Sequence, residues 1–191
     1  MLRVVAVVAL LCSVAVGQEF DGICHLSSEG SQWSGVAISR TEILTVAHPS
    51  PTENIWASFP RIAHGANDRV SIKCRVLRAN KVADLAVIQY DCPKTWIVKT
   101  YDLADERPSV VDIRGYMQME AVVVNGAYVF PIESRIDGYS LLQLRTVARH
   151  GLSGAGAFNA ANEVTGIQSG GSKEHTFCAD VKTIRQFLGD R

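Results

Sequence analysis

The chain has 191 residues, of which 47% are hydrophobic and 20% are charged, and its 19 basic side chains balance its 19 acidic ones. This apolar content with balanced charge excludes an intrinsically disordered segment. A net charge of zero gives no general attraction to polyanions, so we expect binding neither to nucleic acid nor to anionic membranes. The length suits one domain, or two small ones that share an interface.

The first 17 residues predict a secretory signal peptide. Arg3 precedes an unbroken apolar run over residues 4–16, and Ala15, Val16 and Gly17 form a small-x-small cleavage site. The run is short for a bilayer span, so an uncleaved anchor is the weaker interpretation. We therefore expect a soluble, monomeric chain over residues 18–191 that is secreted, either to the cell exterior or, in a bacterium, to the periplasm.

The rest of the chain predicts an all-β protein. Short runs rich in β-branched residues, each bounded by turn residues, are typical of β-sandwiches and barrels. They occupy residues 35–38, 43–46, 70–77, 85–88, 121–124, 128–130, 140–144 and 164–167. Residues 93–108 show little periodicity and indicate a linker between two β-rich halves, 18–92 and 109–191. Two small barrels with a cleft between them would bury these strands.

One helix is predicted, at the end of the second half. Asp180 can cap its first turn and Gly189 can end it. Between them, apolar residues recur at helical spacing: Val181, Ile184, Phe187 and Leu188.

Four cysteines remain after the predicted cleavage: Cys24, Cys74, Cys92 and Cys178. In an oxidising compartment they suggest two disulfides, with three possible connectivities. Cys74 and Cys92 flank a predicted hairpin, so we expect them to pair, which leaves Cys24 with Cys178. Four buried free thiols are the alternative. The spacing contains neither a CxxC nor a His–Cys cluster, so no zinc or other metal site is indicated.

Three local patterns contain residues that could act in catalysis. His48 ends the apolar segment ILTVAH, Asp84 opens the apolar segment ADLAV, and Ser153 lies within GLSGAG. Taken singly, each has an ordinary structural explanation, such as a turn or a strand end. Small residues around a serine also let the backbone turn tightly and expose the hydroxyl. They further allow the N–H groups of Gly151 and Ser153 to point at one spot, as an oxyanion hole requires.

Taken together, the order His48, Asp84, Ser153 closely resembles the chymotrypsin-like serine protease family. The three segments are similar to the family's histidine, aspartate and nucleophile motifs, and GIQSGG, residues 166–171, is similar to the strand that lines its substrate pocket. The short loops are closer to the Deg-type and glutamyl endopeptidase branches than to digestive trypsins. The resemblance spans nearly the whole predicted mature chain. It implies two six-stranded antiparallel β-barrels with a short C-terminal helix.

The resemblance also implies a role for each residue. Ser153 would attack a peptide carbonyl and form an acyl-enzyme, His48 would accept and return the proton, and Asp84 would orient the imidazole. Ser169 would hydrogen-bond the aspartate. The backbone of Ser169, Gly170 and Gly171 would pair with an extended polypeptide substrate. The implied function is a secreted serine endopeptidase that needs no cofactor.

Departures from the family pattern concern activation and specificity. Leu152 stands where members activated by N-terminal cleavage have an aspartate, so we predict no such switch. Val147 stands where trypsins carry the aspartate that selects Arg and Lys, and Gln168 stands where glutamyl endopeptidases carry a histidine. The predicted pocket therefore selects strictly neither for Arg and Lys, as trypsins do, nor for Glu, as glutamyl endopeptidases do. The substrate-binding residues we expect are Val147, His150, Gln168, Ser169, Gly170 and Gly171, with His150, Gln168 and His175 able to favour a polar or acidic side chain.

Two alternatives remain open. A catalytically inactive protein of the same fold could act as a binding module, although inactive members usually lose a triad residue and none is lost here. A serine esterase could use the same nucleophile. Lipase-type hydrolases, however, place a GxSxG elbow in an α/β chain with the order Ser, Asp, His, and neither that order nor the helices are present.

Overall fold

The structure is a computed structural model, and it describes residues 18–49, 54–62, 65–130, 134–136, 138–147 and 151–189. The predicted signal peptide and the predicted pocket residue His150 lie outside these ranges. Within them, no helix is long and apolar enough to cross a membrane.

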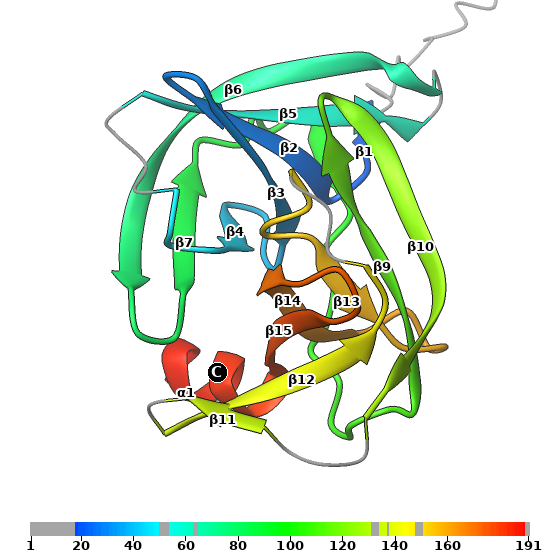
Figure 1. Cartoon of the computed structure of the whole chain (residues 1–191). Helices are drawn as coiled ribbons and strands as arrows, with labels where there is room; N and C mark the ends of the chain where they lie inside the picture. Colours follow the sequence, from blue (N-terminus) through cyan, green and yellow to red (C-terminus); the bar gives the residue numbers. More distant parts are fainter. Residues whose placement is uncertain are drawn as a thin grey trace, which may run out of the picture.

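The first half of the chain forms a closed barrel of six antiparallel strands, at the upper left of Figure 1. The strands are adjacent in the order β2-β3-β4-β7-β6-β5, and β5 pairs with β2 to close the barrel. Their bounds are β2 (Ile23–Ser28), β3 (Ser31–Ala37), β4 (Glu42–Thr45), β5 (Ile55–Arg61), β6 (Gly65–Asn80) and β7 (Leu85–Tyr90). Two short strands, β1 (Gln18–Phe20) and β8 (Trp96–Val98), pair in parallel beside it.

Local sequence accounts for the strands of this barrel. Glu29 and Gly30 have φ values of 30° and 85°, which suit a tight two-residue hairpin between β2 and β3. Residues 85–88 of β7 are fully buried, as an unbroken apolar run predicts. Neighbouring structure therefore covers both faces of β7.

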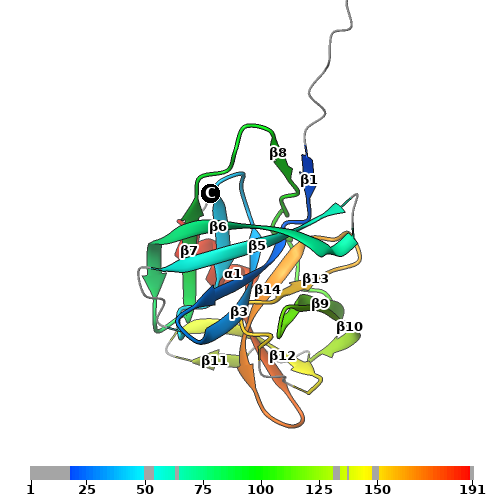
Figure 2. The ribbon, with the colours of Figure 1, turned by 90° about the horizontal axis from the view of Figure 1, so that it is seen from above.

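The second half forms another closed barrel of six antiparallel strands. The order is β10-β9-β13-β14-β15-β12, and β12 pairs with β10 to close it. The bounds are β9 (Val110–Met117), β10 (Glu120–Val129), β12 (Tyr139–Arg145), β13 (Gly156–Phe158), β14 (Val164–Gly171) and β15 (Thr176–Asp180), with β11 (Ser134–Ile136) beside β12. Seen from above, β5 and β6 cross the first barrel while β9 and β10 curl around the second (Figure 2). The predicted pair of six-stranded barrels is confirmed.

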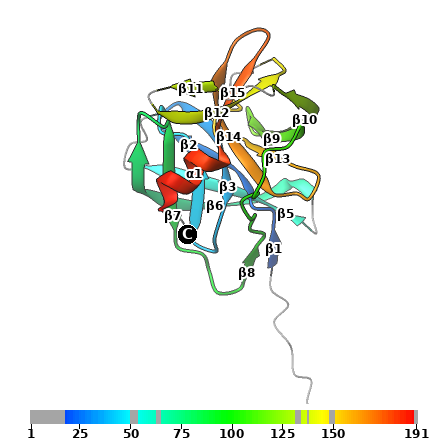
Figure 3. The same cartoon turned by 90° about the horizontal axis from the view of Figure 1, so that it is seen from below.

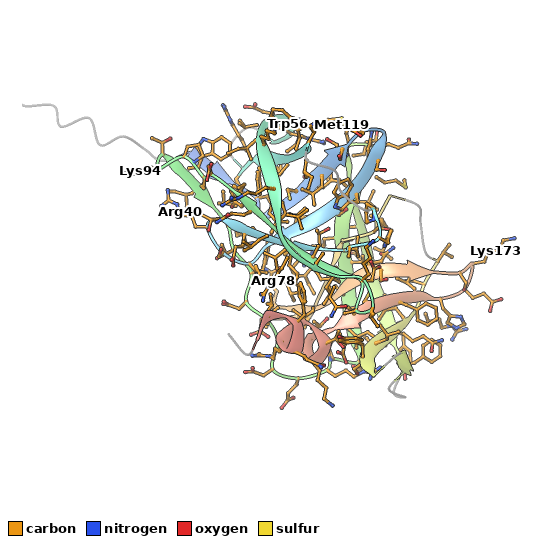
Figure 4. All side chains as sticks on the ribbon, turned by 90° about the vertical axis from the view of Figure 1, so that its left-hand side faces the viewer. Arg40, Trp56, Arg78, Lys94, Met119 and Lys173 are labelled. Atoms are coloured by element: carbon orange, nitrogen blue, oxygen red, sulfur yellow. The ribbon has the colours of Figure 1, made fainter. Side chains whose placement is uncertain are left out.

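A helix, α1 (Val181–Leu188), ends the described part of the chain, lies against both barrels and confirms the prediction. The carboxylate of Asp180 accepts the N–H of Thr183 at 2.9 Å and caps the first turn. Figures 1 and 3 place α1 beside β12. From the first barrel, the Arg78 guanidinium lies 4.8 Å from the ring centroid of Phe187 and donates to the carbonyl of Leu188 (Figure 4). The helix therefore ties the end of the chain to the first barrel.

Two hydrophobic cores fill the barrels, and the first one extends across the junction between them. Side chains of the second barrel, including Phe158 and Ile167, pack into the first core together with Ile184 of the helix. The second core lies within the second barrel and includes Leu152, which is 1% exposed. The junction is thus largely apolar, and the few polar contacts that cross it stand out.

The segment predicted to be an irregular linker contains regular structure. Trp96 and Val98 are buried and Ile97 is exposed, so β8 has the alternation of a strand. Leu103 further along forms an isolated bridge with Val164 of β14. Three residues are too few for a period to show in the sequence, which explains why β8 was not predicted.

The two predicted disulfides are absent from the structure, because all four cysteines are free thiols. Cys24 packs in the first core, where its thiol lies 3.6 Å from the carbonyl oxygen of Gly35, whereas Cys178 packs in the second core. Cys74 and Cys92 direct their thiols to the carbonyls of nearby residues rather than to each other. The alternative of four free thiols is the one that the structure contains.

Candidate active site

His48 and Asp84 come together because of how their two strands pair. His48 follows the end of β4, and Asp84 directly precedes β7. The two strands are antiparallel, with Thr45 opposite Ala86, so the end of one lies beside the start of the other. The Nδ1 atom of His48 lies 2.8 Å from Oδ2 of Asp84.

Backbone N–H groups and a tight turn hold the carboxylate of Asp84 in place. The Oδ1 atom of Asp84 accepts the N–H groups of Ala47 (3.1 Å) and His48 (2.8 Å). Asp84 has φ of 51°, in the left-handed region that Asp tolerates better than most residues. The side chain of Asn80 stabilises the turn before it, because its Oδ1 accepts the N–H groups of Val82 and Ala83.

A third partner of the carboxylate comes from the second barrel. The hydroxyl of Ser169, in β14, donates to Oδ2 of Asp84 at 2.5 Å. Burial alone would raise the pKa of Asp84, but the hydrogen bonds from His48 and Ser169 lower it below its usual value. The hydrogen bond to Asp84 in turn raises the pKa of His48, although partial burial acts in the opposite direction. The side chain of His48 is 47% exposed.

Ser153 lies in a tight turn that packs against the strands of the first barrel. The N–H of Ala155 donates to the carbonyl of Leu152 at 2.9 Å and closes the turn. Gly154 has φ of 80°, and a Cβ atom there would overlap both the carbonyl oxygen of Ser34 and the hydroxyl of Thr45. Only glycine therefore lets the turn approach this closely.

The turn that carries Ser153 packs against the strand that precedes His48. Thr45 ends β4, three residues before His48. The carbonyl of Ser153 itself accepts the N–H of Ser34 in β3 at 2.7 Å. Ser153 is half-buried, so its hydroxyl is not enclosed in the core.

The N–H groups of Gly151 and Ser153 are the ones predicted to form an oxyanion hole. Among the described residues, neither Gly151 nor Ser153 donates a backbone hydrogen bond. Gly151 has φ of 95°, and a Cβ there would lie 3.3 Å from the side chain of Met117, in the β9–β10 hairpin. Two unpaired donors two residues apart in a turn can stabilise an anion on one oxygen atom.

The predicted substrate strand follows the same turn. Ser169 occupies a register shift in the pairing of β14 with β15, and a Cβ at Gly170 would meet nothing within 4 Å. An extended peptide therefore has open space at Gly170. Gly171 is exposed and pairs with Thr176.

The remaining predicted pocket residues differ in how deeply they are buried and in where they lie. Gln168 is 2% exposed, and its Oε1 has no hydrogen-bond partner within the described part of the chain. Val147 is 54% exposed, just after β12. His175 lies in the β14–β15 hairpin, with its ring 5.3 Å from that of Phe130. In the described part of the chain, no three His, Cys, Asp or Glu side chains converge as metal ligands.

Sequence reasoning missed the residues that support the site from behind. Ser34, Thr45 and Asn80 contact the turns that carry the predicted triad, largely through backbone groups. A polar residue inside a buried strand is the one signal that could have identified Ser34 and Thr45, both 0% exposed.

No family model and no curated protein matches this sequence. Solved structures do match. The Rv3671c protease of M. tuberculosis H37Rv, in its inactive form, has a TM-score of 0.72 at 17% identity, over 88% of this chain and 87% of that one. Deg5 has a TM-score of 0.71 at 15% identity, over 86% of each chain. A human pathogenic astrovirus serine protease has a TM-score of 0.60 at 17% identity, over 83% of this chain and 88% of that one. The chain therefore has the chymotrypsin-like fold.

Proposed function

We propose that this chain is a serine endopeptidase that hydrolyses polypeptides through an acyl-enzyme on Ser153. The observation that carries the proposal is the His48–Asp84 pair, held by Ser169 from the other barrel, beside a tight turn that presents a serine. Proteins of this fold among the solved structures are proteases by name, which supports the same reaction class.

The groups present can carry both halves of the reaction. Oγ of Ser153 attacks the peptide carbonyl carbon while Nε2 of His48 takes the hydroxyl proton, and the carbonyl oxygen becomes an oxyanion between the N–H groups of Gly151 and Ser153. The C–N bond then breaks as His48 returns the proton to the leaving amine. Water adds to the acyl-enzyme with His48 again as base, and the released carboxylic acid restores the Ser153 hydroxyl.

Asp84 supports the histidine in each half. Accepting Nδ1–H fixes the tautomer in which Nε2 is a free base, and the negative charge stabilises the imidazolium that forms. The two backbone N–H bonds to Oδ1 keep the carboxylate in place while the charge on the ring changes.

The substrate would bind as an added strand. A peptide in extended conformation can pair with the backbone at residues 169–171, where Gly170 leaves room for it. We propose that the reaction takes place outside the cytoplasm, because the sequence of residues 1–17 predicts a signal peptide.

A fluorophosphonate probe on purified protein tests the proposal, with intact-protein mass as the readout. We expect one adduct on the wild type, none on Ser153→Ala, and slow labelling of His48→Ala. A second control, Ser172→Ala, changes an exposed serine of the β14–β15 hairpin and should label like the wild type. No adduct on folded wild-type protein would contradict the proposal and favour a non-catalytic binding module.

A further inference from the structure

Ser34 is a polar residue at the centre of the junction between the barrels. It lies in β3, is 0% exposed, and contacts three separate segments of the chain. Its N–H donates to the carbonyl of Ser153, and its carbonyl accepts the hydroxyl of Thr45 at 2.6 Å. Its side-chain oxygen accepts the N–H of Tyr116 at 2.8 Å and lies 3.3 Å from the carbonyl of Tyr116, to which it donates.

The hydroxyl of Ser34 makes the hydrogen bonds to Tyr116 of β9 that a neighbouring strand would otherwise make. Strand β9 pairs with β13 up to Arg114, opposite Gly156. In that register Gly115 lies opposite Ala155, and one position further Tyr116 would lie opposite Gly154. Gly154 instead donates its N–H to the carbonyl of Gln168, because the chain leaves the sheet there to form the turn that carries the serine.

Without another partner, the N–H and carbonyl of Tyr116 would be unpaired in a buried position, since Tyr116 is 3% exposed. An unpaired polar group in a buried position destabilises the folded protein, because it has lost its hydrogen bonds to water. One hydroxyl, which can donate and accept at once, satisfies both groups. The side chain of Ser34 therefore allows the chain to depart from the sheet at this point.

Ser34 also links the turn that carries Ser153 to β4, the strand that precedes His48. Ser34 binds Ser153 through its N–H and Thr45 through its carbonyl, while its hydroxyl holds the second barrel. Packing at the contact is tight, because a Cβ at Gly115 would lie 2.6 Å from the Ser34 hydroxyl and 2.6 Å from Cβ of Ala155. A shift of one barrel along the other would change these contacts together.

We propose that Ser34 is a positioning residue, whose hydroxyl sets the register of the two barrels and hence the placement of Ser153 relative to His48. The inference rests on the proposed function, because it concerns the reaction of Ser153. The backbone hydrogen bonds of Ser34 do not depend on its side chain, so Ser34→Ala removes only the two side-chain hydrogen bonds to Tyr116. A misplacement of the reacting groups by about 1 Å can cost about 100-fold in rate.

The test compares Ser34→Ala with Ser58→Ala. Ser58 is also a buried β-strand serine, 6% exposed, and its hydroxyl bonds to that of Ser71 within the first barrel, away from the junction. The readouts are the melting temperature, the rate constant of fluorophosphonate labelling and its dependence on pH. Ser34→Ala should label about 10-fold to 100-fold more slowly than Ser58→Ala, with the pH midpoint of wild type, because the His48–Asp84 pair is untouched.

A third variant separates hydrogen bonding from filling of space. Ser34→Cys occupies nearly the same volume with a weak donor and acceptor, so its labelling rate should lie between those of Ser34→Ala and wild type. Equal labelling of Ser34→Ala and Ser58→Ala would overturn the positioning role, as would full wild-type labelling of Ser34→Cys. An unlabelled wild type would instead overturn the proposed function, so the two failures are distinguishable.

Discussion

The carboxylate of Asp84, from the first barrel, accepts the hydroxyl of Ser169, from the second. This bond makes the placement of the His48 ring depend on both halves of the fold. The two barrels share a largely apolar junction, where a hydrogen bond to a charged group is stronger than one in water.

Ser169→Ala tests this bond. The hydrogen bond from the hydroxyl lowers the pKa of Asp84, so its loss should raise that pKa. We expect fluorophosphonate labelling to slow by about tenfold, the equivalent of a charged hydrogen bond worth about 1.5 kcal/mol. The acid limb of the labelling profile should move to higher pH. A wild-type profile in this variant would mean that Ser169 does not influence the carboxylate.

The His48–Asp84 pair predicts a pH-dependent contribution to stability. The pKa of His48 is raised in the folded state, so its contribution is present below the unfolded value of about 6.5 and is lost as pH rises through the folded value. The pKa of Asp84 is lowered, so its contribution is present above about 3.9 and is lost as pH falls through the folded value. Urea unfolding should show His48→Ala more destabilised at about pH 5 than at about pH 9. Equal losses at both would contradict the coupling.

Gly154→Ala should prevent the serine turn from docking. The added Cβ overlaps Ser34 and Thr45, and the residue has positive φ. Gly126→Ala is the matched control, because Gly126 also has positive φ but open space around it. The control should lose about 1 kcal/mol from backbone strain alone and keep its labelling. The Gly154 variant should lose labelling and more stability, as measured by urea unfolding and intact mass.

Gln168→Leu should make the protein more stable. Among the described residues, the buried Oε1 of Gln168 has no partner, and replacing an unsatisfied group with an apolar one of similar size recovers about 1–3 kcal/mol. Gln89→Leu is the control, because it removes an acceptor that Arg75 uses and should not stabilise. A peptide-library digest should show a changed residue preference at the cleavage site for Gln168→Leu. A loss of stability would mean that the side chain is satisfied in solution.

The four thiols predict an order of alkylation in the native protein. Burial raises the pKa of Cys24, and it raises the pKa of Cys74 and Cys178 to about 12. Buried thiols with raised pKa react slowly, so iodoacetamide should modify the half-buried Cys92 first, as peptide mass mapping would show. Recovery of a Cys74–Cys92 or Cys24–Cys178 peptide without reduction would contradict the free thiols.

The parts of the site that the sequence predicted are those that leave a local pattern. His48 and Asp84 each adjoin a short apolar run, and runs of this kind become the paired strands β4 and β7. The helix was equally visible, because its cap, period and stop lie within ten residues.

The other features of the site and the fold depend on contacts between distant residues, which leave no pattern in the local sequence. Ser34 bonds to the backbone of a residue 82 positions away, so the identity of its partner leaves no trace in the sequence. The number of cysteines indicates the redox compartment, but it does not give the distance between any two thiols. The register of β6 with β7 places Cys74 opposite Tyr90 rather than Cys92. Tertiary packing determines both outcomes.

The apolar anchor of the serine turn has a consequence for how the protein would be controlled. The buried Leu152 side chain anchors the turn in the second core, where the turn has an apolar anchor instead of an ion pair with a new chain terminus. For the endopeptidase proposed above, we therefore predict that the serine turn forms without prior cleavage of the chain. Activity would then be limited by when and where the chain folds and by which polypeptides meet it there, rather than by a maturation step.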